Sequence, residues 1–375
     1  MIEPMDYAAV AALHTLPRTT SLAQAFDDSI QVFAEERTYP IPAPLFIDTC
    51  EPLSARTSEI AARTEGHNDP TYLARLNDVL LTGHRDLFTL DGLHLTDLCN
   101  QAGLHSRPPG LEPNESGGWK RSLGAMVPEL VDETAGLLFF HAASGDNHSH
   151  WLLQTLPQLY LYERAGIRPQ KLIVQPNIQP YQREMLRILG WKDSEILMRP
   201  IDRPVIFREL YAGYVDGAVV PEAAGVYDRL RDAVPRRPGG PEKLFISRQD
   251  ARQVRRFLNE DRLIEAVQEL GFTVVTPGKL GLQEEISLFR GARVITGALG
   301  AGLYNAVYAD PGATVVGLSD PHYVMTWLPE TASLRDHHLA WMFGVAFDSI
   351  EPGYAGTHNN WICDVGQVIA RLRAL

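Results

Sequence analysis

The sequence predicts an α/β protein built from two doubly wound domains. Strand-like apolar runs alternate with helical patterns from Gly136 to about residue 211, and the same alternation resumes at Lys243. Strands that alternate with helices imply a parallel sheet covered on both faces. Between the two series lies Pro-Arg-Arg-Pro-Gly-Gly-Pro at 235–241, where proline and glycine are too dense for a regular element. We therefore expect a linker there, with the domain boundary between 216 and 241.

The segment before the first series is expected to be separate and rich in strands. Short apolar runs lie at 78–84 and 86–95, and Asp91-Gly92 within the second run is a hairpin signal. Residues 101–125 suggest a long loop or flap. The predicted organisation is an N-terminal extension with a β-meander (1–130), a first Rossmann-like domain (131–225), a second (241–350) and a closing segment with a helix (351–375).

Hydrophobic spacing predicts the individual elements of both domains. The first domain has predicted strands at 137–141, 171–174 and 204–211 and helices at 151–165 and 181–189, with Pro157 kinking or opening its helix. The second has predicted strands at 243–247, 272–276, 293–296 and 313–316 and helices at 259–270, 282–289 and 365–373. We expect Asn259 to cap its helix, with Glu260 and Asp261 suited to the positive first turn.

Composition excludes several classes of protein. The 375 residues include 46 acidic and 34 basic side chains, and the formal net charge of −12 disfavours broad attraction to nucleic acid or to an anionic membrane. No apolar run reaches a bilayer-spanning length, and the first residues lack a signal-peptide pattern, so we expect a cytoplasmic protein. Cys50, Cys99 and Cys363 form no CxxC pair, which indicates neither a disulfide framework nor a zinc site.

A glycine turn follows the strand-like run Val294-Ile295-Thr296. It contains Gly297, Gly300 and Gly302 and leads into an apolar helical segment. Free N–H groups at the start of a helix favour an anion, and glycine lets a ligand approach the main chain. The turn therefore predicts a phosphate site, although glycines at such turns also serve packing alone.

A second cluster, at 141–150, contains three histidines and Asp146. Histidine exchanges protons near neutral pH, and an adjacent carboxylate can orient it. His148 and His150 are two residues apart and cannot share one helix face, which argues against a helical metal site. The alternative is a polar turn that caps the following helix.

A third cluster begins at Ser247-Arg248, after a predicted strand, and continues with Arg252, Arg255 and Arg256. In so acidic a chain these arginines make a local positive site, and a guanidinium fork matches phosphate oxygens. For Arg252, Arg255 and Arg256 a solvated helix face is the alternative.

Together these stretches resemble glycosyltransferase family 61, which includes bacterial capsular polysaccharide transferases. The resemblance covers about residues 75–320. Its motifs are His148-Ser-His-Trp-Leu-Leu-Gln-Thr-Leu-Pro, Ile246-Ser-Arg followed by Arg255 and Asn259-Glu260, and Gly300-Ala-Gly-Leu-Tyr-Asn.

The resemblance implies a GT-B fold, with two Rossmann-like domains facing a cleft. The first domain would hold the acceptor and the second the nucleotide-sugar. It implies an inverting, metal-independent transfer from a nucleotide-sugar, with a UDP-sugar expected, to a glycan or polysaccharide hydroxyl. His150 is the first candidate for the base, before Asp146 and His148. The donor-binding residues would be Ser247, Arg248, Arg252, Gly300, Ala301, Gly302, Leu303 and Asn305, with Arg248 at the diphosphate.

The implied partners are the nucleotide-sugar and a glycan acceptor, with no separate cofactor or metal and no nucleic acid. Peripheral association with membrane assembly machinery is compatible with that role. The chain departs from the family pattern at Leu299 in place of histidine, Glu285 in place of glutamine and Gly317 in place of an acidic residue. A degenerate, non-catalytic binding or scaffold protein is therefore the second hypothesis. A dinucleotide oxidoreductase is disfavoured because no GxGxxG follows a strand near the start of either domain.

Overall fold

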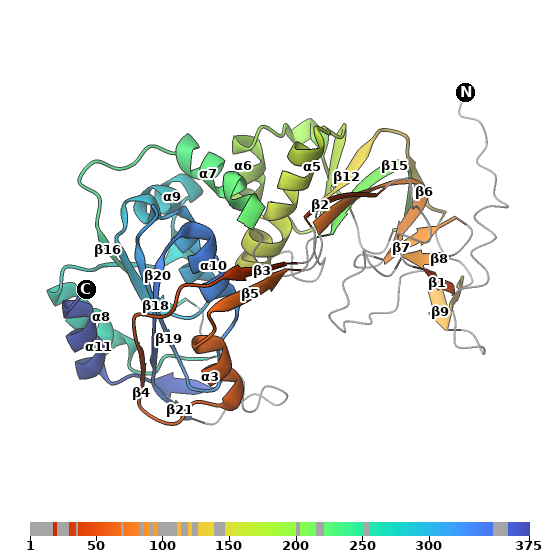
Figure 1. The fold of residues 1–375 in the computed structure, drawn as a ribbon. Helices are drawn as coiled ribbons and strands as arrows, with labels where there is room; N and C mark the ends of the chain where they lie inside the picture. The colour runs from red at the N-terminus through yellow and green to blue at the C-terminus, as the bar shows by residue number, and fades with distance from the viewer. Residues whose placement is uncertain are drawn as a thin grey trace. The chain divides into compact units, whose positions relative to one another are not determined.

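The chain folds into two compact units. The computed structural model describes residues 18–20, 30–34, 37–68, 71–82, 86–90, 93–95, 111–113, 119–121, 127–138, 147–199, 203–214, 221–250, 255–347 and 359–375. Unit 1 takes the described residues of 1–37 and 68–217, and unit 2 takes those of 38–67 and 218–375. Both units mix helices with sheets, as the predicted α/β class requires (Figure 1).

Unit 1 is built on a ten-stranded sheet in the order β1-β8-β7-β6-β15-β12-β13-β14, with β11 also paired to β15 and β2 to β6. Its strands are β1 (Arg18–Thr20), β2 (Ile30–Ala34), β6 (Thr71–Thr82), β7 (Asp86–Thr89), β8 (Leu93–Leu95), β11 (Glu129–Val131), β12 (Ala135–Leu137), β13 (Lys171–Val174), β14 (Ile196–Met198) and β15 (Val205–Tyr214). Strands β9 (Leu111–Pro113) and β10 (Trp119–Arg121) form a separate antiparallel pair, within the segment expected to be loop.

The strands β15, β12, β13 and β14 run parallel, as the alternation predicts. The antiparallel meander β6-β7-β8 is also present, although Asp91 and Gly92 themselves lie outside the described residues. It is not a separate extension, because β6 pairs antiparallel with β15 over most of its length. Ala74 and Leu76 of β6 share one apolar core with Phe207 of β15, and this shared core joins the meander to the main sheet.

The helices of unit 1 follow the prediction closely, and their irregularity has a sequence cause. They are α4 (His148–His150), the π-helix η5 (Trp151–Thr155), the 3₁₀-helix η6 (Leu156–Gln158), α5 (Leu159–Ala165), α6 (Pro180–Ile188) and the 3₁₀-helix η7 (Asp193–Glu195). Pro157 has no N–H to donate, and its ring clashes with the carbonyl four residues earlier. The helix is therefore a π-helix before Pro157 and a 3₁₀-helix around it. Gly166 ends α5 in the left-handed conformation, with φ of 67°.

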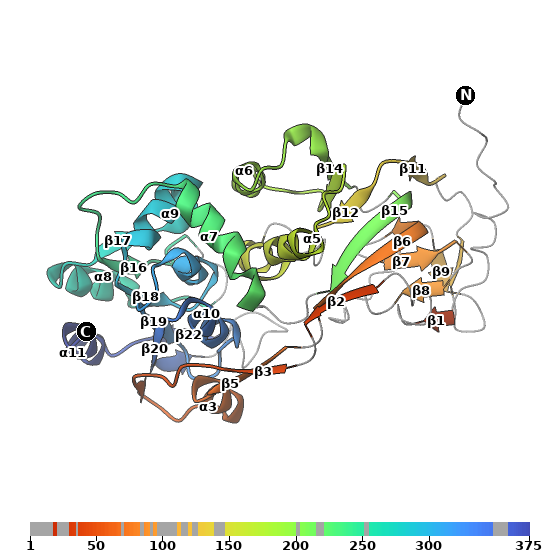
Figure 2. The same ribbon diagram turned by 45° about the horizontal axis from the view of Figure 1, so that its top comes forward.

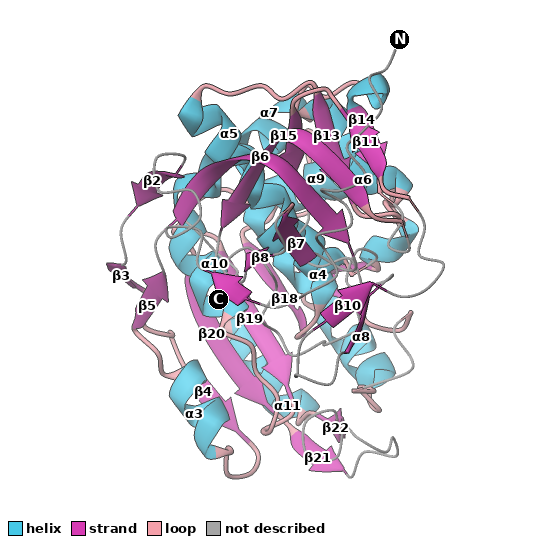
Figure 3. Ribbon diagram, turned by 90° about the vertical axis from the view of Figure 1, so that its right-hand side faces the viewer, coloured by secondary structure: helices cyan, strands magenta, loops and turns pink. Residues whose placement is uncertain are grey.

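Unit 2 contains a six-stranded sheet in the order β17-β16-β18-β19-β20-β4, and all its neighbours are parallel. Figure 3 shows β18, β19 and β20 as adjacent strands. The strands are β4 (Ile47–Thr49), β16 (Lys243–Ile246), β17 (Thr273–Val275), β18 (Val294–Ala298), β19 (Thr314–Ser319) and β20 (His338–Phe343). Two small two-stranded sheets pair β3 (Arg37–Pro40) with β5 (Glu65–Asn68), and β21 (Val345–Phe347) with β22 (Asn360–Ile362), the latter antiparallel.

The segment 38–67 departs from the sequence expectation, because it belongs to unit 2 and not to an N-terminal extension. Its strand β4 adds to the edge of the sheet beside β20, with Ile47 opposite Trp341. Arg371 of the last helix forms an ion pair with Asp48, at 2.6 Å, and lies over the ring of Phe46. Backbone pairing and this charge contact hold a sequence-distant segment on unit 2.

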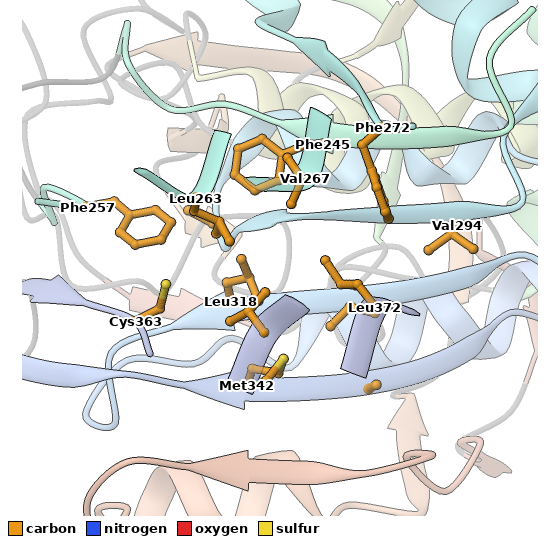
Figure 4. Packing of buried hydrophobic residues seen from close by; sticks show 14 of the residues in the cluster. Phe245, Phe257, Leu263, Val267, Phe272, Val294, Leu318, Met342, Cys363 and Leu372 are labelled. Carbon is orange, nitrogen blue, oxygen red and sulfur yellow. The ribbon is translucent and has the colours of Figure 1, made fainter. Parts of the chain in front are cut away.

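Helices cover the unit 2 sheet and enclose its core. They are α3 (Ala55–Ala61), η8 (Pro221–Ala223), α7 (Ala224–Ala233), α8 (Glu260–Glu269), η9 (Pro277–Lys279), α9 (Leu282–Gly291), η10 (Ala301–Tyr308), α10 (Trp327–Arg335) and α11 (Val365–Arg373), where η8, η9 and η10 are 3₁₀-helices. Helices α8 and α11 lie side by side (Figure 2). Leu263 and Leu372 from these two helices pack with Phe245, Val294 and Leu318 of the strands (Figure 4).

The predicted helices at 259–270, 282–289 and 365–373 are confirmed as α8, α9 and α11, and 235–241 forms no regular element. Sequence reasoning missed α7, which lies in the predicted boundary region with Val226, Tyr227 and Leu230 buried. It also missed α10 and β20. Asn259 does not cap α8, because its side-chain amide instead pairs with the backbone of Cys363, at 2.8 and 3.1 Å.

Candidate functional site

The carboxyl edge of the unit 2 sheet has a topological switch point. The chain passes from β16 to β17 on one side of it and then returns to β18 on the other. In open parallel sheets, ligands bind outside the strand ends at such a point. Ser247 and Arg248 directly follow β16, and Leu299 and Gly300 directly follow β18. The fold therefore brings together two stretches that the sequence singles out, Ser247-Arg248 and the glycine turn.

Two arginines converge at this point on one carbonyl oxygen. Arg248 donates from Nη1 to the oxygen of Leu299 at 3.1 Å, and Arg255 donates from Nη1 to the same oxygen at 3.3 Å. The Nε atoms of both guanidinium groups are buried and have no hydrogen-bond partner among the described residues. A buried donor without a partner is costly, so this pair is suited to an anion.

The charges around Arg248 also favour the binding of an anion. Burial, and after it the positive charge of Arg255, lowers the pKa of Arg248 to about 10. Arg248 remains protonated at neutral pH, but its charged state is less favoured than in water. An anion between the two groups would relieve both the desolvation and the mutual repulsion.

Arg255 is held in an uncommon backbone conformation. Its φ is 55°, in the left-handed region that residues other than glycine rarely adopt. Its guanidinium carbon lies 4.0 Å from the ring centroid of Tyr323, a cation–π contact. Such backbone strain costs on the order of 1–3 kcal/mol and clusters at functional sites. Arg255 is therefore favoured here as a binding residue, over a solvated helix face.

Glu260 fixes the turn that carries Arg248. Its carboxylate accepts a hydrogen bond from the backbone N–H of Arg248 at 2.7 Å and also bonds the Ser247 side chain. Glu260 lies in the first turn of α8 and is 5% exposed, and burial raises its pKa. The helix thus positions the turn through a buried carboxylate.

A polar cavity opens beside Arg248. Its volume is about 400 Å³, and it is lined by Arg248, Gln249, Arg256, Phe257, Leu258, Glu260 and Asp261. The sequence candidate Arg252 lies outside the described residues. The cavity is large enough to hold part of a nucleotide-sized ligand.

The glycine turn differs from its predicted form. The helix after it, η10, is 3₁₀ rather than α, and Gly300 has extended dihedral angles. A Cβ atom on Gly300 would overlap Nη1 of Arg248, and one on Gly302 would lie 3.0 Å from the Pro277 ring. The structure therefore gives a packing reason for both glycines, and the one at 300 makes room for the arginine. Leu303 and Asn305 are buried, Ala301 and Gly302 are half-buried, and their contact with a ligand stays a prediction.

This geometry predicts the effect of Gly300→Ala. The added methyl group forces Arg248 away from the Leu299 carbonyl, so the affinity for a nucleoside diphosphate is expected to fall about tenfold, a loss of one charged hydrogen bond. Isothermal titration calorimetry checks this. The control is Gly225→Ala in α7, where a Cβ would have no neighbour within 4 Å, and it should leave affinity unchanged and stabilise the fold by about 0.5–1 kcal/mol. Equal affinities for the two variants would contradict the assigned role of Gly300.

Unit 1 places His148 and His150 after its own switch point, where β12 lies between β15 and β13. Asn147 caps the helical segment by accepting from the Ser149 N–H at 3.1 Å. The alternative of a polar turn that caps the helix is thus correct in part, because Asn147 of the 141–150 cluster is the cap. The remaining loop residues 141–146, with the predicted Asp146, lie outside the described residues.

The two histidines have different surroundings. The ring of His148 lies 5.3 Å from that of Tyr181, in a tilted contact. Nδ1 of His150 is hydrogen-bonded to Oε1 of Gln154, whose side chain is largely buried. Since an amide oxygen only accepts, this bond places the proton of a neutral ring on Nδ1 and the lone pair on Nε2. His150 is thereby the better suited of the two to take a proton.

The described residues form neither a metal-binding cluster nor a membrane-spanning helix. No three His, Cys, Asp or Glu side chains in the described ranges lie together so as to hold a metal ion. None of the helices in the described part combines the length and apolar character required to cross a bilayer.

Part of the chain matches a known protein family. The model for Glycosyltransferase 61 matches residues 149–316, from α4 to β19. Residues 149–316 are thus similar to glycosyltransferase family 61. No curated protein matches the chain. The matched stretch contains His150, Arg248, Arg255 and Gly300, so it includes the residues of the site described above.

The structure gives a steric reason for one of the three departures from the family 61 pattern and shows the surroundings of the other two. A Cβ atom at Gly317 would lie 2.7 Å from the Trp341 ring and 2.9 Å from Leu328, so no acidic side chain fits there. Leu299 is buried, and its backbone carbonyl, not its side chain, contacts the arginines. Glu285 lies in α9, where burial raises its pKa to about 8.

The pKa of Glu285 predicts a pH-dependent stability. Between its ordinary pKa of 4.5 and about 8, the folded protein binds more protons at this carboxyl than the unfolded chain. The free energy of unfolding therefore falls as the pH rises through that window. Glu285→Gln, which restores the family 61 residue, is expected to stabilise the protein by about 1–3 kcal/mol at pH 8 and little at pH 4.5. Urea unfolding at both pH values measures this, with exposed Glu284→Gln as the control. The same pH slope in wild type and Glu285→Gln would refute it.

Proposed function

We propose that the chain is an inverting, metal-independent glycosyltransferase that moves a hexosyl or pentosyl group from a nucleotide-sugar to a hydroxyl of a glycan or polysaccharide. The observation that carries the proposal is the convergence of Arg248 and Arg255 on the Leu299 carbonyl at the switch point of unit 2. A diphosphate is a double anion whose oxygens match guanidinium donors. A UDP-sugar is the donor we expect first.

In the proposed mechanism, the acceptor hydroxyl attacks the anomeric carbon of the donor sugar. Its proton passes to Nε2 of His150 as the new glycosidic bond forms. The bond between the anomeric carbon and the diphosphate oxygen breaks, and the electron pair leaves with that oxygen. Arg248 and Arg255 stabilise the charge that develops there. A single displacement inverts the anomeric configuration.

The proposal includes the other expectations from the resemblance. The enzyme would be of the GT-B type, with the acceptor bound by unit 1 and the donor by unit 2. It would act in the synthesis of a bacterial cell-surface polysaccharide, in the cytoplasm, with a peripheral link to membrane assembly machinery.

A non-catalytic binding protein of the same pathway is the second candidate. It is favoured by Leu299 and Gly317, where an imidazole and a carboxylate of the family pattern are missing. Such a protein would bind the nucleotide-sugar without cleaving it, so binding and turnover must be measured separately.

The test is a transfer assay with UDP-, GDP-, CMP- and dTDP-sugars, a set of glycan acceptors, and EDTA in half of the reactions. We expect release of one nucleotide with and without EDTA, and a product of opposite anomeric configuration by proton NMR. Binding without release would favour the non-catalytic candidate. Retained configuration, or loss of activity in EDTA, would overturn the proposed mechanism.

A further inference from the structure

The turn after β19 adds a second polar group beside the arginines. Asp320 follows the last residue of β19, and β19 is the neighbour of β18, whose end carries Leu299. The N–H of Leu299 donates to the carbonyl of Leu318 at 2.7 Å, so the two strand ends are tied together. Asp320 therefore lies one strand away from the carbonyl that Arg248 and Arg255 contact.

The carboxylate of Asp320 is buried and half-satisfied. The residue is 1% exposed, and Oδ1 accepts from the N–H of His322 at 2.9 Å. The side chain of Asn359 also bonds the carboxylate. Oδ2 is buried and has no hydrogen-bond partner among the described residues. An acceptor left in that state costs free energy, which suggests a partner that is not part of the described chain.

The same turn holds Arg255. The N–H of Tyr323 donates to the carbonyl of Asp320 at 3.3 Å, and the hydroxyl of Ser319 donates to the carbonyl of Tyr323 at 2.8 Å. This closed turn places the Tyr323 ring against the Arg255 guanidinium. Arg255 is also close enough for its charge to lower the pKa of Asp320, although burial outweighs it and the net shift is upward. One turn thus positions a cation and an acceptor in the same neighbourhood.

The surroundings of Asp320 favour a neutral hydroxyl as the hydrogen-bond partner of Oδ2. A metal ion is disfavoured, because the nearby Arg255 repels cations and no group of three His, Cys, Asp or Glu side chains forms among the described residues. A phosphate is also disfavoured, since two anions would then meet in a desolvated place. A neutral hydroxyl donates one hydrogen bond to a carboxylate and adds no charge.

We propose that Oδ2 of Asp320 accepts a hydrogen bond from a hydroxyl of the ligand whose anionic part binds Arg248 and Arg255. The hydroxyl belongs either to the ribose of the nucleotide or to the transferred sugar. The inference rests on the proposed function, since it requires a nucleotide or nucleotide-sugar at the arginines. Asp320 is then a specificity-determining residue, three positions after the glycine that cannot carry a side chain.

The test compares Asp320→Asn with the wild type by calorimetry, using UDP, 2′-deoxy-UDP, 3′-deoxy-UDP and UDP-glucose. Asparagine keeps the shape but presents a donor in place of one acceptor. We expect the variant to bind UDP-glucose about ten to a hundred times more weakly, the range of a hydrogen bond to a charged group. If ribose is the source, UDP weakens equally and one deoxy analogue binds both proteins alike. If the sugar is the source, only UDP-glucose weakens.

Thermal unfolding without ligand separates binding from a structural role. Because burial makes the Asp320 charge unfavourable, Asp320→Asn should unfold at the wild-type temperature or above it. The matched control, exposed Asp336→Asn, removes the same charge at a left-handed position that asparagine tolerates, and it should leave binding unchanged. Unchanged binding of all four ligands by Asp320→Asn, or weaker binding with a clearly lower unfolding temperature, would overturn this inference alone. A wild-type protein that binds no nucleotide would overturn the proposed function as well.

Discussion

Arg248→Ala is expected to weaken the binding of a nucleoside diphosphate by about 10²–10³-fold, since a guanidinium makes two charged hydrogen bonds to it. The side chain is half-buried beside Arg255, and its guanidinium group donates to the Leu299 carbonyl. Its removal takes away a desolvated charge, so the folded state should not be destabilised. Isothermal titration calorimetry gives the affinity, and thermal unfolding gives the stability.

Two further variants make this test specific. Arg262→Ala removes an exposed guanidinium from α8 in the same unit and should leave affinity unchanged. Arg248→Lys keeps the charge but loses the fork, so its affinity should fall between wild type and Arg248→Ala. If Arg248→Ala and Arg262→Ala bound the diphosphate equally well, the anion site would have to lie elsewhere.

His150→Ala is expected to reduce kcat for glycosyl transfer by about 10²–10⁴-fold, the usual contribution of a general base. The donor does not need the imidazole for binding, so its KM should change little. In the proposed mechanism Nε2 takes the proton, because Nδ1 is hydrogen-bonded to Gln154. Steady-state kinetics with saturating acceptor separates the two parameters.

The control for this variant is His338→Ala, an exposed histidine at the start of β20. It should retain full kcat. His148→Ala should also lose less activity than His150→Ala, since the His148 ring is placed against Tyr181. A His150→Ala variant with wild-type kcat would exclude the imidazole as the base and direct attention to Asp146.

The sequence was most informative where local pattern and tertiary structure agree. Apolar runs of strand length and the helical spacing of Leu263 and Val267 predicted the parallel series of both units, because buried strands and amphipathic helices satisfy the same core. The segment 38–67 could not be assigned in this way. Strand β4 is held by pairing with β20, where Ile47 lies opposite Trp341. No local signal in the sequence encodes a contact between segments so far apart in the chain.

The site was predictable only in part, for a similar reason. Arg248 and Gly300 stand directly after strands, so their meeting follows from the topology of a parallel sheet. The close approach that makes Gly300 necessary depends on where the Arg248 side chain lies. Asp320 and Tyr323 follow a strand as well, but their importance emerges only from burial and from the contact with Arg255.

The most direct measurement is a calorimetric titration of the wild-type protein with UDP, GDP, CMP, dTDP and NAD, without added metal, followed by the sugar conjugate of whichever nucleotide binds. We expect one nucleoside diphosphate to bind at a single site, and a concentration of about a hundred times its Kd to stabilise the fold by roughly 2.7 kcal/mol. If the folded protein gave no heat of binding and no stabilisation with any nucleoside diphosphate, the proposed donor site would be contradicted.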